Sequence, residues 1–224
     1  MKLLRQVCLW VLVCGFVPVR AQRILPQDNP IFNGERKFAA GICLGANFTQ
    51  VDGDYMNGYH KVGLNTGFTG WVSLSRKWGL ALDLLFSQKG SNSATARESS
   101  AVGTYFEHYR IRLNYAEVPV VVQMRIKEQF LFGIGASYNS LISSKEEMND
   151  ASSDKVFDSG VYPFRRSSFD GILNASWLFY NNWVLNARYQ YSLTPIRKIH
   201  DVPDGLGYKD QTNNQFTFRL VRMF

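Results

Sequence analysis

Residues 38–49 read FAAGICLGANFT, and large apolar side chains alternate with small or polar ones along this stretch. Phe38, Ile42, Leu44 and Phe48 share one parity, whereas the other parity carries alanine, glycine, cysteine, asparagine and threonine. A period of two sustained over about ten residues is typical of a strand that crosses a membrane. The stretch therefore predicts a β-strand with one face toward lipid and the other toward a polar interior.

Seven further segments show the same alternation. With the first, the predicted strands cover residues 38–49, 63–75, 79–89, 106–126, 130–142, 169–179, 183–193 and 215–224. The connections alternate between tight turns and long polar stretches at residues 50–62, 90–105, 143–168 and 194–214. Residues 38–224 are therefore predicted to form an all-β fold, an eight-stranded antiparallel up-and-down transmembrane β-barrel.

Three features favour a membrane barrel over a soluble β-sandwich. The strands are long, since globular strands usually hold about five or six residues. Their polar face carries small, hydrogen-bonding side chains, and a closed sheet pairs every backbone amide inside hydrocarbon. Aromatic residues gather near the strand ends, as expected at the two membrane surfaces. They are Trp78, Phe130, Tyr180 and Trp183 by the short turns, and Tyr105, Tyr109, Tyr138 and Tyr191 near the long connections.

The segment 106–126 changes phase along its length. Apolar residues from Tyr109 to Tyr115 have odd numbers, and those from Val118 to Ile126 have even numbers. A β-bulge near Ala116–Glu117, beside Pro119, would return all of them to one face. The sequence predicts such a bulge.

The N-terminal residues predict export. Residues 1–21 combine a cationic start, an apolar run and the ending Val19-Arg20-Ala21, as in a cleaved signal peptide. Acylation at Cys14 is the alternative. Residues 22–37 are polar and predict a short periplasmic lead-in. Without residues 1–21, the formal net charge falls from +7 to +4, which predicts no nucleic-acid partner. Cys43 is then the remaining cysteine, which predicts no disulfide and no cysteine metal site.

The charged residues on the inward parity form the candidate site. An eight-stranded barrel has an interior that side chains fill, so a solute channel is not expected. Buried charges need partners, and a mutually neutralising polar plug is the first interpretation; a proton or ligand path through Asp83, Glu117 and Arg188 is the alternative. The predicted interior network consists of Asp83, Lys89, Glu117, Arg125, Asp170, Arg188 and Arg219, and Arg110 and Arg112 are also assigned to the interior.

The long connections hold the other titratable residues. His60, His108 and His200 lie in or beside them, together with Asp52, Asp54, Asp201 and Asp204. A small-ligand site, or a site that hydrolyses lipid or peptide, at this rim is the alternative function. No nucleophile elbow, zinc-protease helix or phosphate loop is present, so the sequence predicts no enzyme, no catalytic residues, no metal and no cofactor.

Several motifs resemble one family. GANF at 45–48, LLFSQKG at 84–90, LNYAEVP at 113–119, RYQYSL at 188–193 and Asn213-Asn214 are similar to the PorT-like outer-membrane β-barrel family of Bacteroidetes-type bacteria. The resemblance implies an eight-stranded outer-membrane barrel, and PorT itself is associated with protein secretion. The lead-in is not close to that of PorT. Expected partners are outer-membrane lipid and an envelope or secretion-system protein that this barrel scaffolds or docks. Both termini are expected to be periplasmic and the long loops extracellular.

Overall fold

The computed structural model describes residues 36–54, 58–99, 103–127, 129–150, 153–180, 182–203 and 206–224. The predicted signal peptide and nearly all of the predicted lead-in lie outside this part of the chain. The strands are β1 (Phe38–Asp54), β2 (Lys61–Ser73), β3 (Trp78–Ser99), β4 (Gly103–Lys127), β5 (Phe130–Asp150), β6 (Ser153–Phe157), β7 (Ser167–Tyr180), β8 (Trp183–Ser192) and β9 (Gly207–Met223), and a short 3-10 helix, η1, covers Ile199–Asp201.

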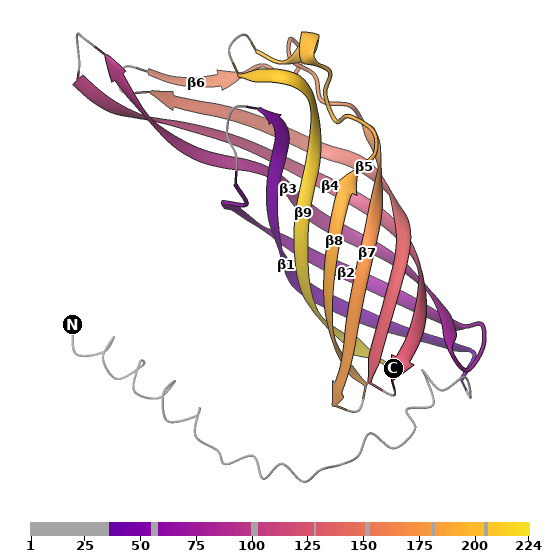
Figure 1. Ribbon diagram of the computed structural model, residues 1–224. Helices are drawn as coiled ribbons and strands as arrows, with labels where there is room; N and C mark the ends of the chain where they lie inside the picture. Colours follow the sequence, from indigo (N-terminus) through magenta and orange to yellow (C-terminus); the bar gives the residue numbers. More distant parts are fainter. Residues whose placement is uncertain are drawn as a thin grey trace, which may run out of the picture.

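Eight of these strands close into a ring. The order around it is β1-β2-β3-β4-β5-β7-β8-β9, each neighbour is antiparallel, and β9 pairs back with β1 (Figure 1). The backbone amide of Phe224 donates to the carbonyl of Ala40 at 2.8 Å, so both ends of the ring-forming chain meet at the end that carries the short turns. The predicted eight-stranded antiparallel barrel is confirmed.

The outer wall of the ring is apolar, and we call it the apolar belt. Its side chains remain exposed in the isolated chain, as Leu44 (62%) and Ile134 (68%) illustrate. Soluble proteins rarely leave so large a continuous apolar surface in water. The belt comprises Phe38, Ile42, Leu44, Phe48, Val62, Leu64, Phe68, Leu82, Leu84, Val118, Val120, Val122, Ile126, Phe130, Phe132, Ile134, Ile142, Phe169, Leu173, Trp177, Leu185, Leu193, Phe216, Phe218 and Leu220.

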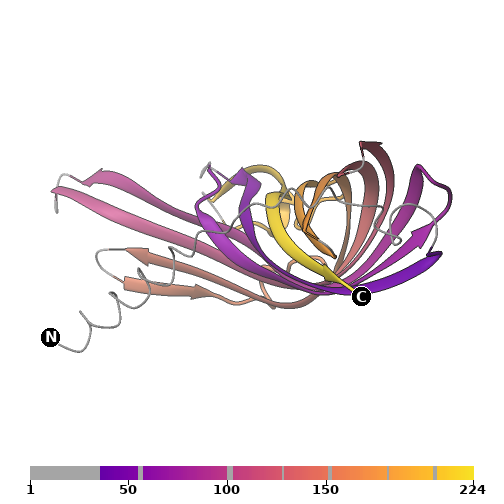
Figure 2. The same cartoon turned by 90° about the horizontal axis from the view of Figure 1, so that it is seen from below.

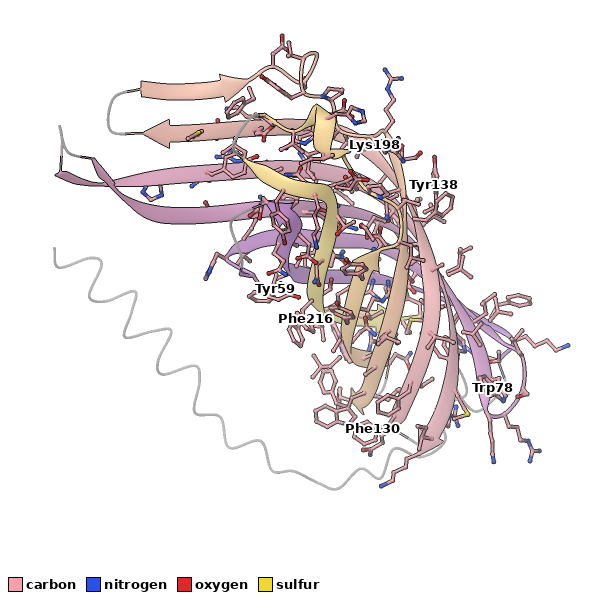
Figure 3. The ribbon with its side chains drawn as sticks, turned by 45° about the horizontal axis from the view of Figure 1, so that its top comes forward. Tyr59, Trp78, Phe130, Tyr138, Lys198 and Phe216 are labelled. Carbon is pink, nitrogen blue, oxygen red and sulfur yellow. The ribbon has the colours of Figure 1, made fainter. Side chains whose placement is uncertain are left out.

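Aromatic side chains mark both edges of the belt (Figure 3). At the short-turn end, the rings of Phe130 and Trp177 stack with centroids 6.3 Å apart. At the long-loop end, the ring centroids of Tyr138 and Phe169 are 5.4 Å apart. Tyr109 does not belong to this edge, because it faces the interior and is fully buried. Tyr105 lies outside the residues whose side chains are described.

A second aromatic group at the long-loop end was not foreseen from the sequence. Tyr59 and Tyr189 both pack on Phe216, with ring centroids 5.1 Å and 5.0 Å away. The Tyr59 hydroxyl also donates to Asn214 Oδ1 at 2.8 Å. An amphipathic ring with its hydroxyl at the upper edge of the belt suits a membrane surface.

The predicted bulge at Ala116–Glu117 is wrong. β4 keeps one register with β3 from Met124 to Gly103, and its odd-numbered residues from Tyr109 to Gln123 face inward. The irregularity lies instead in β5, where Ile142 is inserted between the partners of Asn114 and Tyr115. The phase change in the sequence marks a change of surroundings: the lower half of β4 is apolar outward, and the upper half is apolar inward.

A four-stranded sheet continues beyond the ring at the long-loop end, and we call it the extension. It consists of the upper parts of β3, β4 and β5 with β6, and it leaves the barrel on one side (Figures 1 and 2). Most of the predicted connections 90–105 and 143–168 that lie within the described residues are strand here. β2 pairs with β3 only as far as Ser87, whereas β3 continues to Ser99.

Candidate functional site

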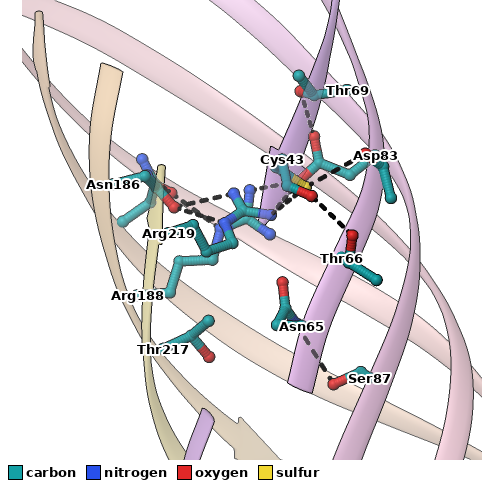
Figure 4. A network of polar contacts seen from close by, with 12 residues as sticks. Cys43, Asn65, Thr66, Thr69, Asp83, Ser87, Asn186, Arg188, Thr217 and Arg219 are labelled. Carbon is teal, nitrogen blue, oxygen red and sulfur yellow. Dashed lines mark hydrogen bonds and ion pairs between the residues drawn. The ribbon is translucent and has the colours of Figure 1, made fainter. Parts of the chain in front are cut away.

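The lower of two buried charge clusters joins three strands (Figure 4). Asp83 Oδ2 on β3 lies 2.6 Å from Arg188 Nη2 on β8 and 3.1 Å from Arg219 Nη1 on β9. Thr69 donates a further hydrogen bond to Asp83 Oδ1, and Asn186 Oδ1 accepts from Arg219. All three charged side chains are at most 3% exposed, so two guanidinium groups share this carboxylate in an interior shielded from bulk solvent.

The upper cluster has the opposite composition. Lys89 Nζ on β3 lies 2.8 Å from Asp170 Oδ2 on β7 and forms a second ion pair with Glu117 on β4. Gln190 and Ser192 on β8 each donate to Asp170 at 2.8 Å. Here one cation is shared by two carboxylates.

Neutral polar side chains form further hydrogen bonds around the two clusters. Asn47 on β1 donates to Ser87 at 2.8 Å and accepts from Thr217 on β9 at 2.8 Å. Asn186 bridges to Asn174 at 2.8 Å. Hydrogen-bonded networks of this kind are stable in a low-dielectric interior when their members are satisfied.

The two clusters together are electrically neutral. The lower cluster carries one excess positive charge and the upper one excess negative charge, so three cations balance three anions. Removing one member of a buried ion group leaves an uncompensated charge, which costs far more than losing an exposed pair. The arrangement is therefore a polar plug whose parts depend on one another.

An apolar cluster fills the barrel toward the short-turn end and reaches up beside the lower charge cluster. It consists of Cys43, Trp71, Ala81, Leu85, Val121, Leu131, Ile172, Leu178, Val184, Val221 and Met223. Between this apolar plug and the two arginines lies a cavity of about 40 Å³. A cavity of that size holds water molecules. It does not hold a typical solute.

A conductance measurement tests this plug. In a planar lipid bilayer, the purified barrel is expected to show no stepwise, solute-sized conductance, because side chains fill the described interior. Current recordings alongside a porin of known conductance supply the positive control. Reproducible open-channel steps from this protein would contradict a plugged interior.

Six of the seven residues predicted for the interior network make the two clusters. The seventh, Arg125, lies on the inward parity but is partly exposed at the short-turn rim, where its backbone amide bonds to the carbonyl of Lys77. It lies eight residues from Glu117, which is about 26 Å along a strand. Arg110 and Arg112 were wrongly assigned to the interior: both are exposed on the outer face of β4.

A segment around Arg197, before η1, lies over the interior at the long-loop end, and we call it the cover. It was not predicted from the sequence. Arg197 makes a two-pronged ion pair with Glu146 on β5, at 2.7 Å and 2.9 Å, and donates to Gln211 at 2.9 Å. Its guanidinium lies 4.1 Å from the ring centroid of Phe164, and Tyr109 donates to the same Glu146.

The surroundings fix the charge states in this cover. Burial opposes the charge of Arg197, but the hydrogen bonds and charge of Glu146 outweigh it and raise the pKa of Arg197. Burial and the Glu146 carboxylate raise the pKa of Tyr109, so its phenol stays a neutral donor. In the sequence, this covered region is indicated by the apolar residues at odd-numbered positions from Tyr109 to Tyr115, which face inward.

The rim residues that suggested a hydrolytic site do not gather. His60, His108 and His200 are exposed, and His200 lies 3.5 Å from Asp201. Asp52 accepts from Gln50 and Asn214, and Asp54 is buried. Asp204 lies outside the described residues. Among the residues that are described, no three histidine, cysteine or acidic side chains are grouped as metal ligands would be.

Comparison with known proteins gives likeness of fold. Ail, the attachment invasion locus protein of Yersinia pestis, is 16% identical over 84% of this chain and 100% of its own, with a TM-score of 0.46. Neisserial surface protein A is 10% identical over 84% of this chain and 98% of its own, with a TM-score of 0.44. The outer membrane protease OmpT from Escherichia coli is 11% identical over 84% of this chain and 96% of its own, with a TM-score of 0.35.

No curated protein matches the sequence significantly. In the described part of the chain, no helix has the length and apolarity to cross a membrane. A family described as the outer membrane protein beta-barrel domain matches residues 21–198, most of the chain, in agreement with the closed ring and its apolar belt. The chain belongs to the outer membrane protein beta-barrel domain family.

Proposed function

We propose that this protein is a non-enzymatic outer-membrane barrel that docks another envelope protein through its extension. In this proposal the short turns and both termini are periplasmic, and the extension is extracellular. The observation that carries it is the pair of sheet edges in the extension. The interior supports it, because a neutral plug of paired charges suits a scaffold better than a transporter.

The two edges are on β3 and β6. β3 runs to Ser99, well beyond its last pairing with β2 at Ser87, and β6 is the final strand in the sheet order. The carbonyls of Gln88 and Gly90 accept hydrogen bonds from β1 side chains. From residue 91 onward, no described strand pairs with β3 on the side away from β4, and none pairs with the outer side of β6. An unpaired edge presents rows of amide and carbonyl groups that an extended segment of another protein can join. Val156 on β6 is 65% exposed and would add an apolar contact.

The resemblance to PorT-like barrels suggests the class of partner. A component of an envelope protein-secretion machine is the first candidate. Bacterial barrels of this size carry short periplasmic turns and longer external loops, which supports the orientation.

Shortening the extension tests the docking role. In the variant, residues 95–107 are replaced by Asn-Gly, which suits a two-residue turn between Ala94 and His108, paired neighbours in β3 and β4. We expect the ring to fold normally, because the parts of β3 and β4 that pair within the ring are kept. Recovery of a cross-linked partner from intact membranes should fall at least roughly tenfold, since the outer part of the β3 edge, residues 95–99, and its hydrogen bonds are removed.

Two measurements make that result decisive. Heat-dependent gel mobility reports whether the shortened barrel is folded, and a Val156→Ala variant serves as a milder control on the other edge. A wild-type protein that is a solitary monomer after cross-linking in its native membrane would refute docking. Full partner recovery with the shortened extension would refute the assignment to this edge.

A further inference from the structure

Four cations lie side by side just above the apolar belt, at the start of the extension. Arg110 and Arg112 are exposed on the outer face of β4, and Arg112 pairs in register with Lys145 on β5 and with Gly90 on β3. A Cβ atom built on Gly90 would lie 3.3 Å from Lys61 Cε, so the stem of Lys61 on β2 reaches the same place. The basic cluster therefore spans four neighbouring strands.

The cluster is only partly neutralised by the groups around it. Glu147 is the acid that faces it, 3.4 Å from Arg112 and in an ion pair with Lys145. Burial and the charges of Arg112 and Arg110 lower the pKa of Lys61. Among the side chains that the structure describes here, one carboxylate faces four cations, an excess of three positive charges.

The basic cluster lies directly on the upper edge of the belt. Val62 follows Lys61 and is 63% exposed. Ile142, inserted in β5 beside Asn114, is 60% exposed, and Asn114 is only two residues from Arg112. At a strand rise of about 3.4 Å per residue, the guanidinium groups are within one headgroup layer of these apolar side chains.

We propose that Lys61, Arg110, Arg112 and Lys145 bind the phosphate of a phosphorylated glycolipid in the outer leaflet. The acyl chains of this lipid lie on Val62, Val118 and Ile142. Guanidinium groups match phosphate with paired hydrogen bonds, and basic groups above a bilayer attract anionic headgroups. The inference rests on the orientation proposed above, because this edge must face the outer leaflet.

Charge complementarity and the adjoining belt favour a lipid over a soluble anion. A soluble phosphate would use the cations alone, whereas a lipid also covers the exposed side chains beneath them. On β9 the exposed charges are mixed, with Lys209 beside Asp210. Arg165 and Arg166, just before β7, are two further exposed cations of the long-loop end, and the backbone amide of Leu141 donates to the carbonyl of Arg166 at 2.7 Å.

Lipid titration of the purified full-length barrel in nonionic detergent tests the site. The probe is diphosphorylated lipid A, counted per barrel by native mass spectrometry, with inorganic phosphate as the competing soluble anion. Arg110→Gln with Arg112→Gln should weaken lipid binding roughly 10- to 30-fold, at about a factor of five for each base. Lys198→Gln with Lys209→Gln removes two exposed cations elsewhere and should leave binding nearly unchanged.

Each outcome decides a separate point. Equal binding by the arginine variant and wild type overturns the site, and displacement of the lipid by millimolar inorganic phosphate overturns the lipid assignment. Folding of both variants is checked by heat-dependent gel mobility. Orientation is tested separately, by labelling Lys145→Cys on whole cells with a membrane-impermeant maleimide. Failure of that labelling overturns the orientation and the lipid site with it. A failed docking test, in which no partner is recovered by cross-linking, does not affect the lipid-binding result.

Discussion

Replacing Lys89 with methionine is expected to lower the free energy of unfolding of the barrel by about 3–5 kcal/mol. Lys89 is completely buried, and it is the cation held between Glu117 and Asp170. Methionine fills a similar volume but leaves two carboxylates close together in a dry interior. The measurement is urea unfolding of the barrel refolded in lipid vesicles, followed by tryptophan fluorescence.

Acid should restore part of the lost stability in this variant. A protonated carboxyl carries no charge, so acidification removes the repulsion between Glu117 and Asp170. The variant therefore gains stability relative to wild type as the pH falls and loses it as the pH rises. The triple variant with Glu117→Gln and Asp170→Asn should regain part of the loss at neutral pH, since no unpaired charge remains in the upper cluster while the lower cluster keeps its excess positive charge.

Lys145→Met is the matched control, because the Lys145 side chain is 54% exposed and its ion pair with Glu147 is in water. Exposed pairs contribute about 0–1 kcal/mol. An equal effect of both lysine replacements would contradict the buried polar plug. The plug would also be contradicted if the free energy of unfolding of the Lys89→Met barrel varied with pH no more than that of wild type.

The barrel could be predicted from the sequence because lipid imposes a strict local pattern. Between Phe38 and Phe48, for example, each second residue must face hydrocarbon, so strand number and face follow from periodicity alone. The extension lacks that constraint. Residues 90–99 are polar with small side chains, as in a loop, and only long-range pairing of β3 with β4 makes them strand.

The interior charges could be placed on the inward face from parity, but their partners could not. Lys89 and Asp170 are 81 residues apart, and their meeting depends on how far the strands are staggered around the ring. Parity also misassigned Arg110 and Arg112, because a bulge was invoked to keep one apolar face. Along this segment the surroundings of the outer face change from the apolar belt to the exposed extension, where the apolar residues from Tyr109 to Tyr115 face inward.

The cover at the long-loop end yields the second large effect. Arg197→Met is expected to destabilise the segment 194–203 by about 3 kcal/mol, since it leaves the Glu146 carboxylate buried without its cation. Glu146 is 3% exposed, and Gln211 loses its hydrogen-bond donor as well. The segment should then open roughly 100-fold more often, because about 1.4 kcal/mol corresponds to a factor of ten.

This opening should be local. The ring strands do not depend on Arg197, so gel mobility after heating should match wild type, while opening of the cover is measured by hydrogen exchange. The amides of Ile196 and Gln211 report it, because each bonds across the cover at 2.8 Å. Lys198→Met, at an exposed neighbour, should leave their exchange unchanged, and adding Glu146→Gln to Arg197→Met should restore protection. Unfolding of the whole barrel with Arg197→Met, or unaltered exchange, would show that this ion pair does not hold the cover, whereas a local change would establish that the long-loop end can open above an intact plug.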